Sequence, residues 1–177
     1  MKIIKKILYV IVGIIVLVLV AAVFVSKEYN VRREITINKP SQEVFDYVKF
    51  VKNQQYYNKW VMADPNMKKD YTGTDGTVGF VYAWDSQDDN VGKGEEKIKL
   101  LDEGKQVNLE VRFIRPFEGL AETEMTTEAL SPSQTKVSWG MSGQSKYPMN
   151  ITNAFIDGML GPDLEESLQT LKGVLEK

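Results

Sequence analysis

The sequence predicts an α+β protein in which one transmembrane helix precedes a curved antiparallel sheet wrapped around a long C-terminal helix. Residues 7–25 are apolar and uncharged. The middle of the chain alternates apolar and polar residues in short runs between turn residues, and residues 151–175 carry an apolar stripe at helical spacing. We therefore expect an N-terminal membrane anchor over residues 1–28 and one domain over residues 29–177.

The segment Ile7–Val25 has the length and composition of a membrane span. Its roughly 19 residues match the ~20 that a helix needs to cross the hydrocarbon core of a bilayer. A cleaved signal peptide has a shorter apolar region, of roughly 7–15 residues, that ends at small residues. The small pair Ala21-Ala22 instead lies inside the run, which favours an uncleaved anchor over a signal peptide or a buried core helix.

Basic residues flank this segment on both sides. Lys2, Lys5 and Lys6 precede it, whereas Lys27 and Arg32-Arg33 follow it closely. The positive-inside rule counts both flanks, so the balance favours a cytoplasmic N-terminus only slightly. We expect a single-pass protein of a bacterial inner membrane with its domain on the non-cytoplasmic side.

Composition excludes several classes of chemistry. From Ser26 onward, 19 basic residues face 24 acidic ones, so the domain lacks the basic surface that nucleic acids require. The chain has no cysteine and no histidine, which rules out disulfides, Ser-His-Asp triads and histidine or cysteine metal ligands. We expect no metal, cofactor or nucleic-acid partner, and any acid–base chemistry must use Asp, Glu, Lys or Tyr.

The order of predicted elements is specific. Residues 32–38 alternate as a first strand, and Ser41 is positioned to cap a short helix. A second short helix is predicted over residues 53–60. About six antiparallel strands follow between residues 68 and 143, and a last helix begins at Asn150. Pro162 lies inside this last helix and is expected to kink it.

This order, with its local motifs, resembles the START-like or SRPBCC superfamily, also called the polyketide cyclase/dehydrase and lipid-transport family. The resemblance covers residues 30–177 and implies the helix-grip fold, with a deep apolar cavity between sheet and helix. The family includes binding proteins, transporters and cyclases, so the fold alone does not fix the function. The residues that carry it are Ile35–Val48, Trp60, Tyr82–Trp84, Val91–Glu95, Met159–Glu165 and Leu168–Leu171.

Three functions are compatible with this resemblance. We expect a membrane-anchored domain that binds or transfers a small hydrophobic molecule, either a lipid or an aromatic compound. The first alternative is a cyclase or hydratase acting on a hydrophobic substrate through an inward carboxylate beside a tyrosine. The second is a non-catalytic module with a filled interior and an exposed apolar patch that docks another protein.

Candidate cavity residues are aromatic, methionine or acidic side chains on the predicted strands and helices, although for any one apolar residue ordinary core packing is the more common role. Of the strand carboxylates we select Glu95 and Glu122 for the cavity mouth, and we expect only one of Tyr82 and Trp84 to face inward. No catalytic residue is assigned. The full set is Tyr57, Trp60, Phe80, Tyr82, Trp84, Glu95, Phe113, Glu122, Met125, Trp139, Met141, Phe155 and Met159.

Two other motifs have simpler interpretations. The acidic residues between Asp85 and Asn90 do not match the spacing of a calcium-binding loop, so a solvated hairpin tip is expected. Gly92-Lys93-Gly94 lacks the spacing of a phosphate-binding loop, and its glycines predict a bulge or a tight bend.

Overall fold

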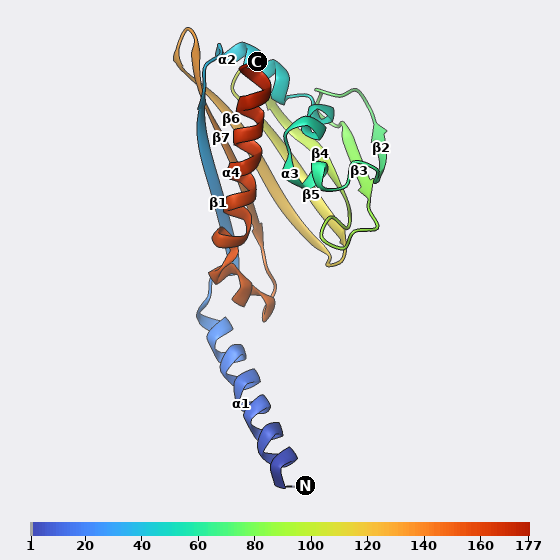
Figure 1. Cartoon of the computed structure of the whole chain (residues 1–177), viewed down its shortest axis with the longest axis vertical. Coiled ribbons are helices and arrows are strands. Elements are labelled where there is room, and N and C mark those ends of the chain that lie inside the picture. The colour runs from blue at the N-terminus through green and yellow to red at the C-terminus, as the bar shows by residue number, and fades with distance from the viewer. Residues whose placement is uncertain (1) are drawn as a thin grey trace.

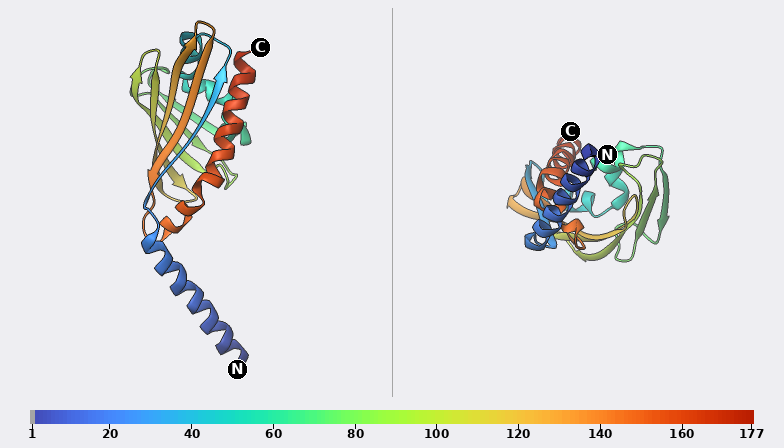
Figure 2. Two further views of the ribbon diagram at one scale, coloured as in Figure 1. Left: turned by 90° about the vertical axis from the view of Figure 1, so that its left-hand side faces the viewer. Right: turned by 90° about the horizontal axis from the view of Figure 1, so that it is seen from below.

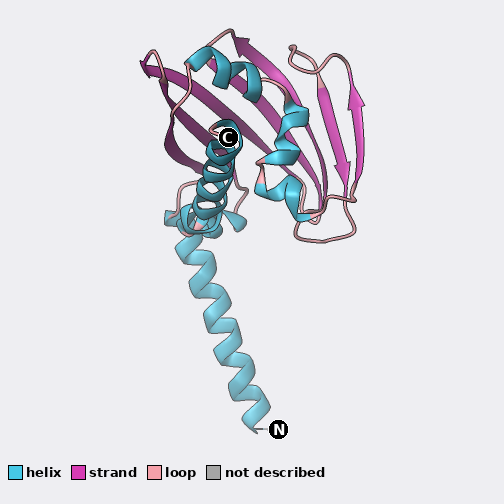
Figure 3. Cartoon of the chain, turned by 45° about the horizontal axis from the view of Figure 1, so that its top comes forward, coloured by secondary structure: helices cyan, strands magenta, loops and turns pink. Residues whose placement is uncertain are grey.

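The computed structural model describes residues 2–177 and confirms the predicted helix-grip architecture (Figure 1). A single seven-stranded antiparallel sheet has the order β1-β7-β6-β5-β4-β3-β2. The sheet curves around the helices that pack on its inner face (Figure 3). The strands are β1 Glu28–Ile37, β2 Lys68–Thr72, β3 Val81–Asp85, β4 Lys93–Asp102, β5 Gln106–Arg115, β6 Gly119–Ser131 and β7 Gln134–Gln144.

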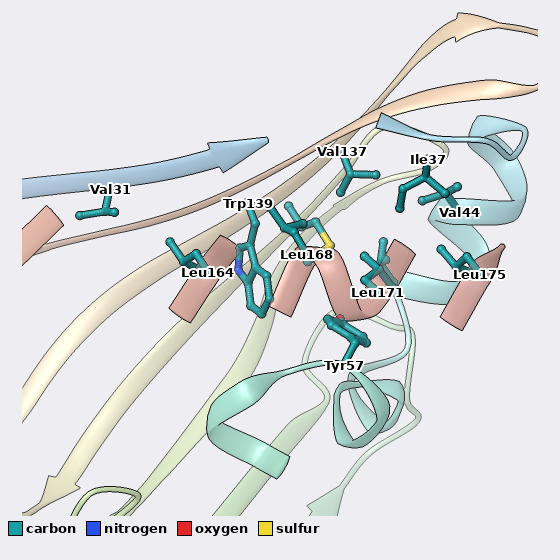
Figure 4. Packing of buried hydrophobic residues seen from close by; sticks show 12 residues of the cluster. Val31, Ile37, Val44, Tyr57, Val137, Trp139, Leu164, Leu168, Leu171 and Leu175 are labelled. Atoms are coloured by element: carbon teal, nitrogen blue, oxygen red, sulfur yellow. The ribbon is translucent and has the colours of Figure 1, made fainter. Parts of the chain in front are cut away.

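The long C-terminal helix α4 lies along β1 and β7 and supplies one half of the core. Its leucines recur every three to four residues, which places Leu164, Leu168 and Leu171 on one buried stripe. Figure 4 shows these side chains pointing at Trp139 and Val137 of β7. The helical elements are α1 Lys2–Phe24, α2 Ser41–Val48, η1 Val51–Tyr56, α3 Lys59–Ala63, η2 Met149–Ala154 and α4 Ile156–Leu175.

A second apolar cluster fills the other end of the sheet, where β3, β4 and β5 meet α2 and α3. Phe45, Phe80 and Ile98 are almost completely buried there. The two clusters lie on either side of a space that neither fills, and this space is the cavity described below.

Three local predictions at the helix ends need correction. Ser41 is the first residue of α2, whereas Pro40 occupies the cap position and no side chain caps that helix. The single short helix expected over residues 53–60 is two pieces, η1 and α3, separated by Asn58, whose Oδ1 accepts a hydrogen bond from Trp60 N at 3.0 Å. The last helix begins at Ile156 rather than Asn150.

Helix α1 projects from the domain as an isolated rod (Figure 2). It is the one helix of the described residues that is long and apolar enough to cross a membrane, although a signal sequence or a soluble core helix would meet the same criterion. Of its side chains from Ile3 onward, only Ala22 is buried.

Truncation of Leu168 measures how much α4 contributes to the fold. Leu168 is 1% exposed and packs in the cluster that joins α4 to the sheet. We expect Leu168→Ala to lower the free energy of unfolding by about 2–5 kcal/mol, since it removes buried methyl groups and leaves a cavity. Urea denaturation followed by circular dichroism checks this, and a loss below about 1 kcal/mol would contradict the tight packing of α4.

Candidate functional site

A cavity of about 380 Å³ lies between the curved sheet and the helices that cover it. Its volume falls within the range typical of small-molecule sites, roughly 300–1,000 Å³. The sheet supplies the floor from β3 to β7, while Gln54 of η1, Trp60 and Val61 of α3, and Leu160 of α4 cover it. The cavity is therefore the part of the space inside the curved sheet that the covering helices leave unfilled.

The floor follows from strand alternation. Residues two apart on a strand share a face, so Val111 and Phe113 of β5 both point into the cavity. The same rule places both Tyr82 and Trp84 of β3 inward. The expectation that only one of these two would face inward was therefore wrong.

Aromatic rings form much of the wall, and all three tryptophans of the chain contribute to it. Trp60 packs edge-on against Trp139, with ring centroids 6.4 Å apart. On the other side, the Tyr82 and Trp84 rings lie 5.8 Å apart, and Trp84 meets Phe113 at 6.4 Å. The Trp60–Trp139 and Trp84–Phe113 pairs are edge-to-face and the Tyr82–Trp84 pair is tilted, and such aromatic contacts fix the shape of the wall.

Two buried polar atoms interrupt this wall without a partner. Glu96 of β4 is 7% exposed, Tyr82 of β3 is 3% exposed, and the two residues are paired across the strands. Neither Glu96 Oε1 nor Tyr82 Oη has a hydrogen-bond partner anywhere in residues 2–177. Leaving a buried polar atom unpaired costs about 1–3 kcal/mol, and both oxygens are closed off from the cavity space as well as from bulk water, so they lie within the wall rather than on its surface.

Burial governs the protonation of both groups. Removal from water raises the pKa of Glu96 to about 8, and the negative charge of Asp75 adds to the rise while the Gln54 side chain opposes it. Burial likewise raises the pKa of Tyr82, and Glu96 contributes to that shift. At neutral pH the Glu96 carboxyl is therefore protonated, and it lies in the cavity wall on the strand next to Tyr82.

The cavity mouth lies between the β3–β4 and β5–β6 hairpins, which Arg115 joins through one ion pair and one hydrogen bond. Arg115 Nη2 contacts Asp85 Oδ1 at 2.8 Å and donates to the carbonyl of Ser86 at 2.8 Å. Trp84 Nε1 donates to the Val91 carbonyl at 3.2 Å. Gly92 has φ +65°, and a Cβ there would lie 2.1 Å from the Arg115 carbonyl oxygen, so the expected tight bend at Gly92 is present and its glycine is required.

The structure brings only part of the predicted set together at the cavity. Tyr57 and Met125 line a much smaller adjoining pocket, and Phe80 is core. Phe155 and Met159 are 69% and 62% exposed and lie outside the cavity. The candidates that line the cavity are Trp60, Tyr82, Trp84, Phe113, Trp139 and Met141.

The prediction that Glu95 and Glu122 lie at the cavity mouth was wrong, because both side chains point away from the cavity. Glu95 lies on the outer face of β4, where Arg112 Nε approaches its Oε1 at 3.9 Å. Glu122 is exposed on β6, one position before the inward-facing Thr123. Glu96 was missed although the apolar Ile98, two residues along the same strand, marks its face as buried. No cluster of three His, Cys, Asp or Glu in the described part of the chain is arranged to hold a metal ion.

Comparisons with known proteins support the fold and leave the activity open. No protein-family model matches the sequence, and no curated protein matches it either. Among solved structures the domain is similar to XoxI from Bacillus cereus (TM-score 0.63, 8% identity, 84% of this chain and 96% of that one). It is also similar to protein CV1439 from Chromobacterium violaceum (TM-score 0.59, 15% identity, 84% and 97%).

A third similar structure is norcoclaurine synthase from Thalictrum flavum, solved in complex with dopamine and hydroxybenzaldehyde (TM-score 0.62, 12% identity, 84% of this chain and 86% of that one). At these identities the likeness establishes the architecture alone. The domain therefore shares the helix-grip architecture of these structures, and its function has to be argued from its own cavity.

Proposed function

We propose that this protein is a membrane-anchored helix-grip domain that binds a small apolar molecule in the cavity between the sheet and α4. The observation that carries the proposal is the cavity of about 380 Å³, which is walled by aromatic side chains and left unfilled by both core clusters. A module that only docked another protein would not need such an unfilled interior, since voids lower stability.

The isolated helix α1 supports membrane anchoring. Its side chains between Ile3 and Phe24 are largely exposed and apolar, a surface that water disfavours and a bilayer accommodates. The Asn150 amide donates to the carbonyls of Ala22 and Val25, and the Asn153 amide donates to the carbonyls of Ser26 and Lys27. A removable leader would not require these contacts.

The test is ligand capture by the full-length protein. Protein purified in mild detergent from the membranes of its own source is examined by native mass spectrometry, and its organic extract is analysed for small molecules. We expect an apolar molecule at close to one per chain. Titration with N-phenyl-1-naphthylamine should also give energy transfer from the cavity tryptophans. Absence of both a bound molecule and energy transfer would overturn the proposal.

A second candidate function is proton transfer, which is favoured specifically by Glu96. A carboxyl group with a pKa of about 8 can act as base or acid close to neutral pH, and Glu96 belongs to the residues that line the cavity. In this reaction Glu96 removes a proton from the carbon next to a carbonyl, and the electron pair moves onto the carbonyl oxygen to give an enolate.

This candidate is tested with 2-tetralone as an apolar ketone probe. Nuclear magnetic resonance in D₂O follows exchange of its α-hydrogens in the presence of the full-length protein. If Glu96 is the base, exchange accelerates as pH rises through about 8, is lost in Glu96→Gln and persists in Glu95→Gln, whose side chain lies outside the cavity. Equal rates in the wild type and Glu96→Gln would leave simple binding as the function.

A further inference from the structure

The end of α1 is fastened to the domain by side chains from η2 and the loop before it. The last carbonyls of a helix have no partners within the helix. Here Asn150 Nδ2 donates at 2.6 Å to the carbonyl of Ala22, in the last turn of α1, and at 2.8 Å to that of Val25, just past the helix. Tyr147 Oη donates at 3.2 Å to the carbonyl of Leu19, about one turn earlier. Since Asn150 is 1% exposed, this cap is a buried joint rather than a surface contact.

This joint sets how far the domain stands from the membrane. Leu19 lies six residues before Val25, about 9 Å along a helix axis at 1.5 Å per residue. A side chain that reaches the Leu19 carbonyl therefore lies beside the last turns of a helix that fills the hydrocarbon core. Residues 147–149 must accordingly lie in the interfacial layer of the bilayer that holds α1.

The strand register places the cavity mouth at the same end. Tyr29, at the start of β1 and five residues after α1, pairs with Gly143, which pairs with Ala121 at the start of β6. The β5–β6 turn, including Phe117, therefore lies at the anchor end of the sheet. Figure 1 shows this turn and η2 at the end of the domain from which α1 leaves.

Large apolar side chains are exposed on both sides of this mouth. Phe117 in the β5–β6 turn is 77% exposed and Leu120 is 52% exposed. At the start of α4, Phe155 is 69% exposed and Met159 is 62% exposed, and Leu160, which directly follows Met159, lines the cavity. Single exposed apolar residues are ordinary, but a group of them around a cavity mouth beside an anchor is typical of a membrane-contacting surface.

We propose that these four residues, the mouth collar, insert into the bilayer that holds α1, so that the cavity exchanges its ligand directly with the lipid phase. This inference rests on the proposed function and adds to it that the ligand is dissolved in the membrane. An apolar molecule that moves from lipid into the cavity never exposes its surface to water, a step that would cost about 25 cal/mol per Å². The inserted mouth collar gives the ligand a route from the lipid to the cavity that excludes water.

Insertion is measured with single cysteines, because the native chain has none. Leu120→Cys and Met159→Cys are labelled with the fluorophore NBD in full-length protein held in phosphatidylcholine nanodiscs. The matched control is Leu130→Cys, which has almost the same exposure, 51%, and lies at the opposite end of the same strand as Leu120. We expect blue-shifted emission that brominated phosphatidylcholine quenches at positions 120 and 159, and emission that aqueous iodide quenches at position 130.

Exchange is measured as the rate at which N-phenyl-1-naphthylamine moves from phosphatidylcholine vesicles into the cavity. The variant Leu120→Ser/Phe155→Ser/Met159→Ser changes no cavity-lining residue and should load at least tenfold more slowly than Leu130→Ser. Its affinity for the same probe added in detergent should be unchanged. Labels at positions 120 and 159 that behave like position 130 would overturn the inference, even if the probe binds normally. Failure of the probe to bind in detergent, with the labels inserted, would overturn the proposed function and leave membrane insertion standing.

Discussion

We expect the wild-type protein to lose stability as the pH rises from about 4.5 to about 8, and we expect Glu96→Gln not to show this loss. The ordinary pKa of a glutamate, 4.5, applies to the unfolded chain, whereas burial raises the pKa of Glu96 to about 8 in the folded protein. Between these values the folded state keeps a proton that the unfolded state has released, so the free energy of unfolding falls as pH rises. The loss is complete above the folded pKa and absent below the unfolded one.

The size of this effect is large for one side chain. A rise of about 3.5 pKa units, from 4.5 to about 8, corresponds to about 5 kcal/mol at 1.36 kcal/mol per unit, comparable to the whole stability of a small domain. Glu96→Gln keeps the shape of the side chain without a titrating proton. We therefore expect this variant to be more stable than the wild type at pH 8, with the pH-dependent part of the difference disappearing below pH 4.5.

The measurement is urea denaturation of the full-length protein in one detergent at several pH values. Glu95→Gln is the matched control, because it removes the neighbouring carboxyl on the outer face of the same strand. Its pH profile should run parallel to that of the wild type. A Glu96→Gln profile that also runs parallel would mean that Glu96 is ionised and solvated in the folded protein, contrary to its burial.

The architecture could be predicted because its periodicities are strong. Val107, Leu109 and Val111 alternate strictly and are all buried, as a strand with one core face requires. The leucines from Leu164 to Leu175 likewise follow a single helical stripe. Such patterns depend on local spacing alone, so they can be recognised in the sequence before any tertiary contact is known.

The choice between Glu95 and Glu96 depends on strand phase, which is harder to establish from the sequence. The ladder between β4 and β5 shifts register at Lys93/Gly94 and again between Ile98 and Leu100. Across the second shift the alternation breaks, since Ile98 is buried whereas Leu100 is 45% exposed. Two adjacent glutamates between bulges do not themselves indicate which of them faces the cavity. Only the buried Ile98, two residues after Glu96, shows that Glu96 is on the inner face.

The role of Asn150 could not be found from local sequence at all. An asparagine before an apolar helical stripe predicts an N-cap, yet this side chain caps the C-terminal end of α1, a segment 125 or more residues away in the chain. Phe155 and Met159 are exposed for a different reason, because they lie at the start of α4, before the buried leucine stripe begins at Leu164.

Filling the cavity from its floor should abolish binding while the fold survives. Thr123 of β6 is 5% exposed and lines the cavity. Thr123→Phe places a ring where a ligand would lie, and phenylalanine is a favourable strand residue. We expect the affinity for N-phenyl-1-naphthylamine to fall at least a hundredfold, as energy transfer from the cavity tryptophans would report.

The neighbouring Thr126→Phe is the matched control, because residue 126 lies on the outer face of the same strand and outside the cavity. Both variants add the same ring to β6, so a general effect on the strand would weaken binding in both. Loss of binding in Thr123→Phe alone, with the urea midpoint of each variant close to that of the wild type, would place the ligand between the sheet and α4. Unchanged affinity in Thr123→Phe would instead locate the probe on the exposed apolar surface, most simply the mouth collar, and would remove the cavity from the function.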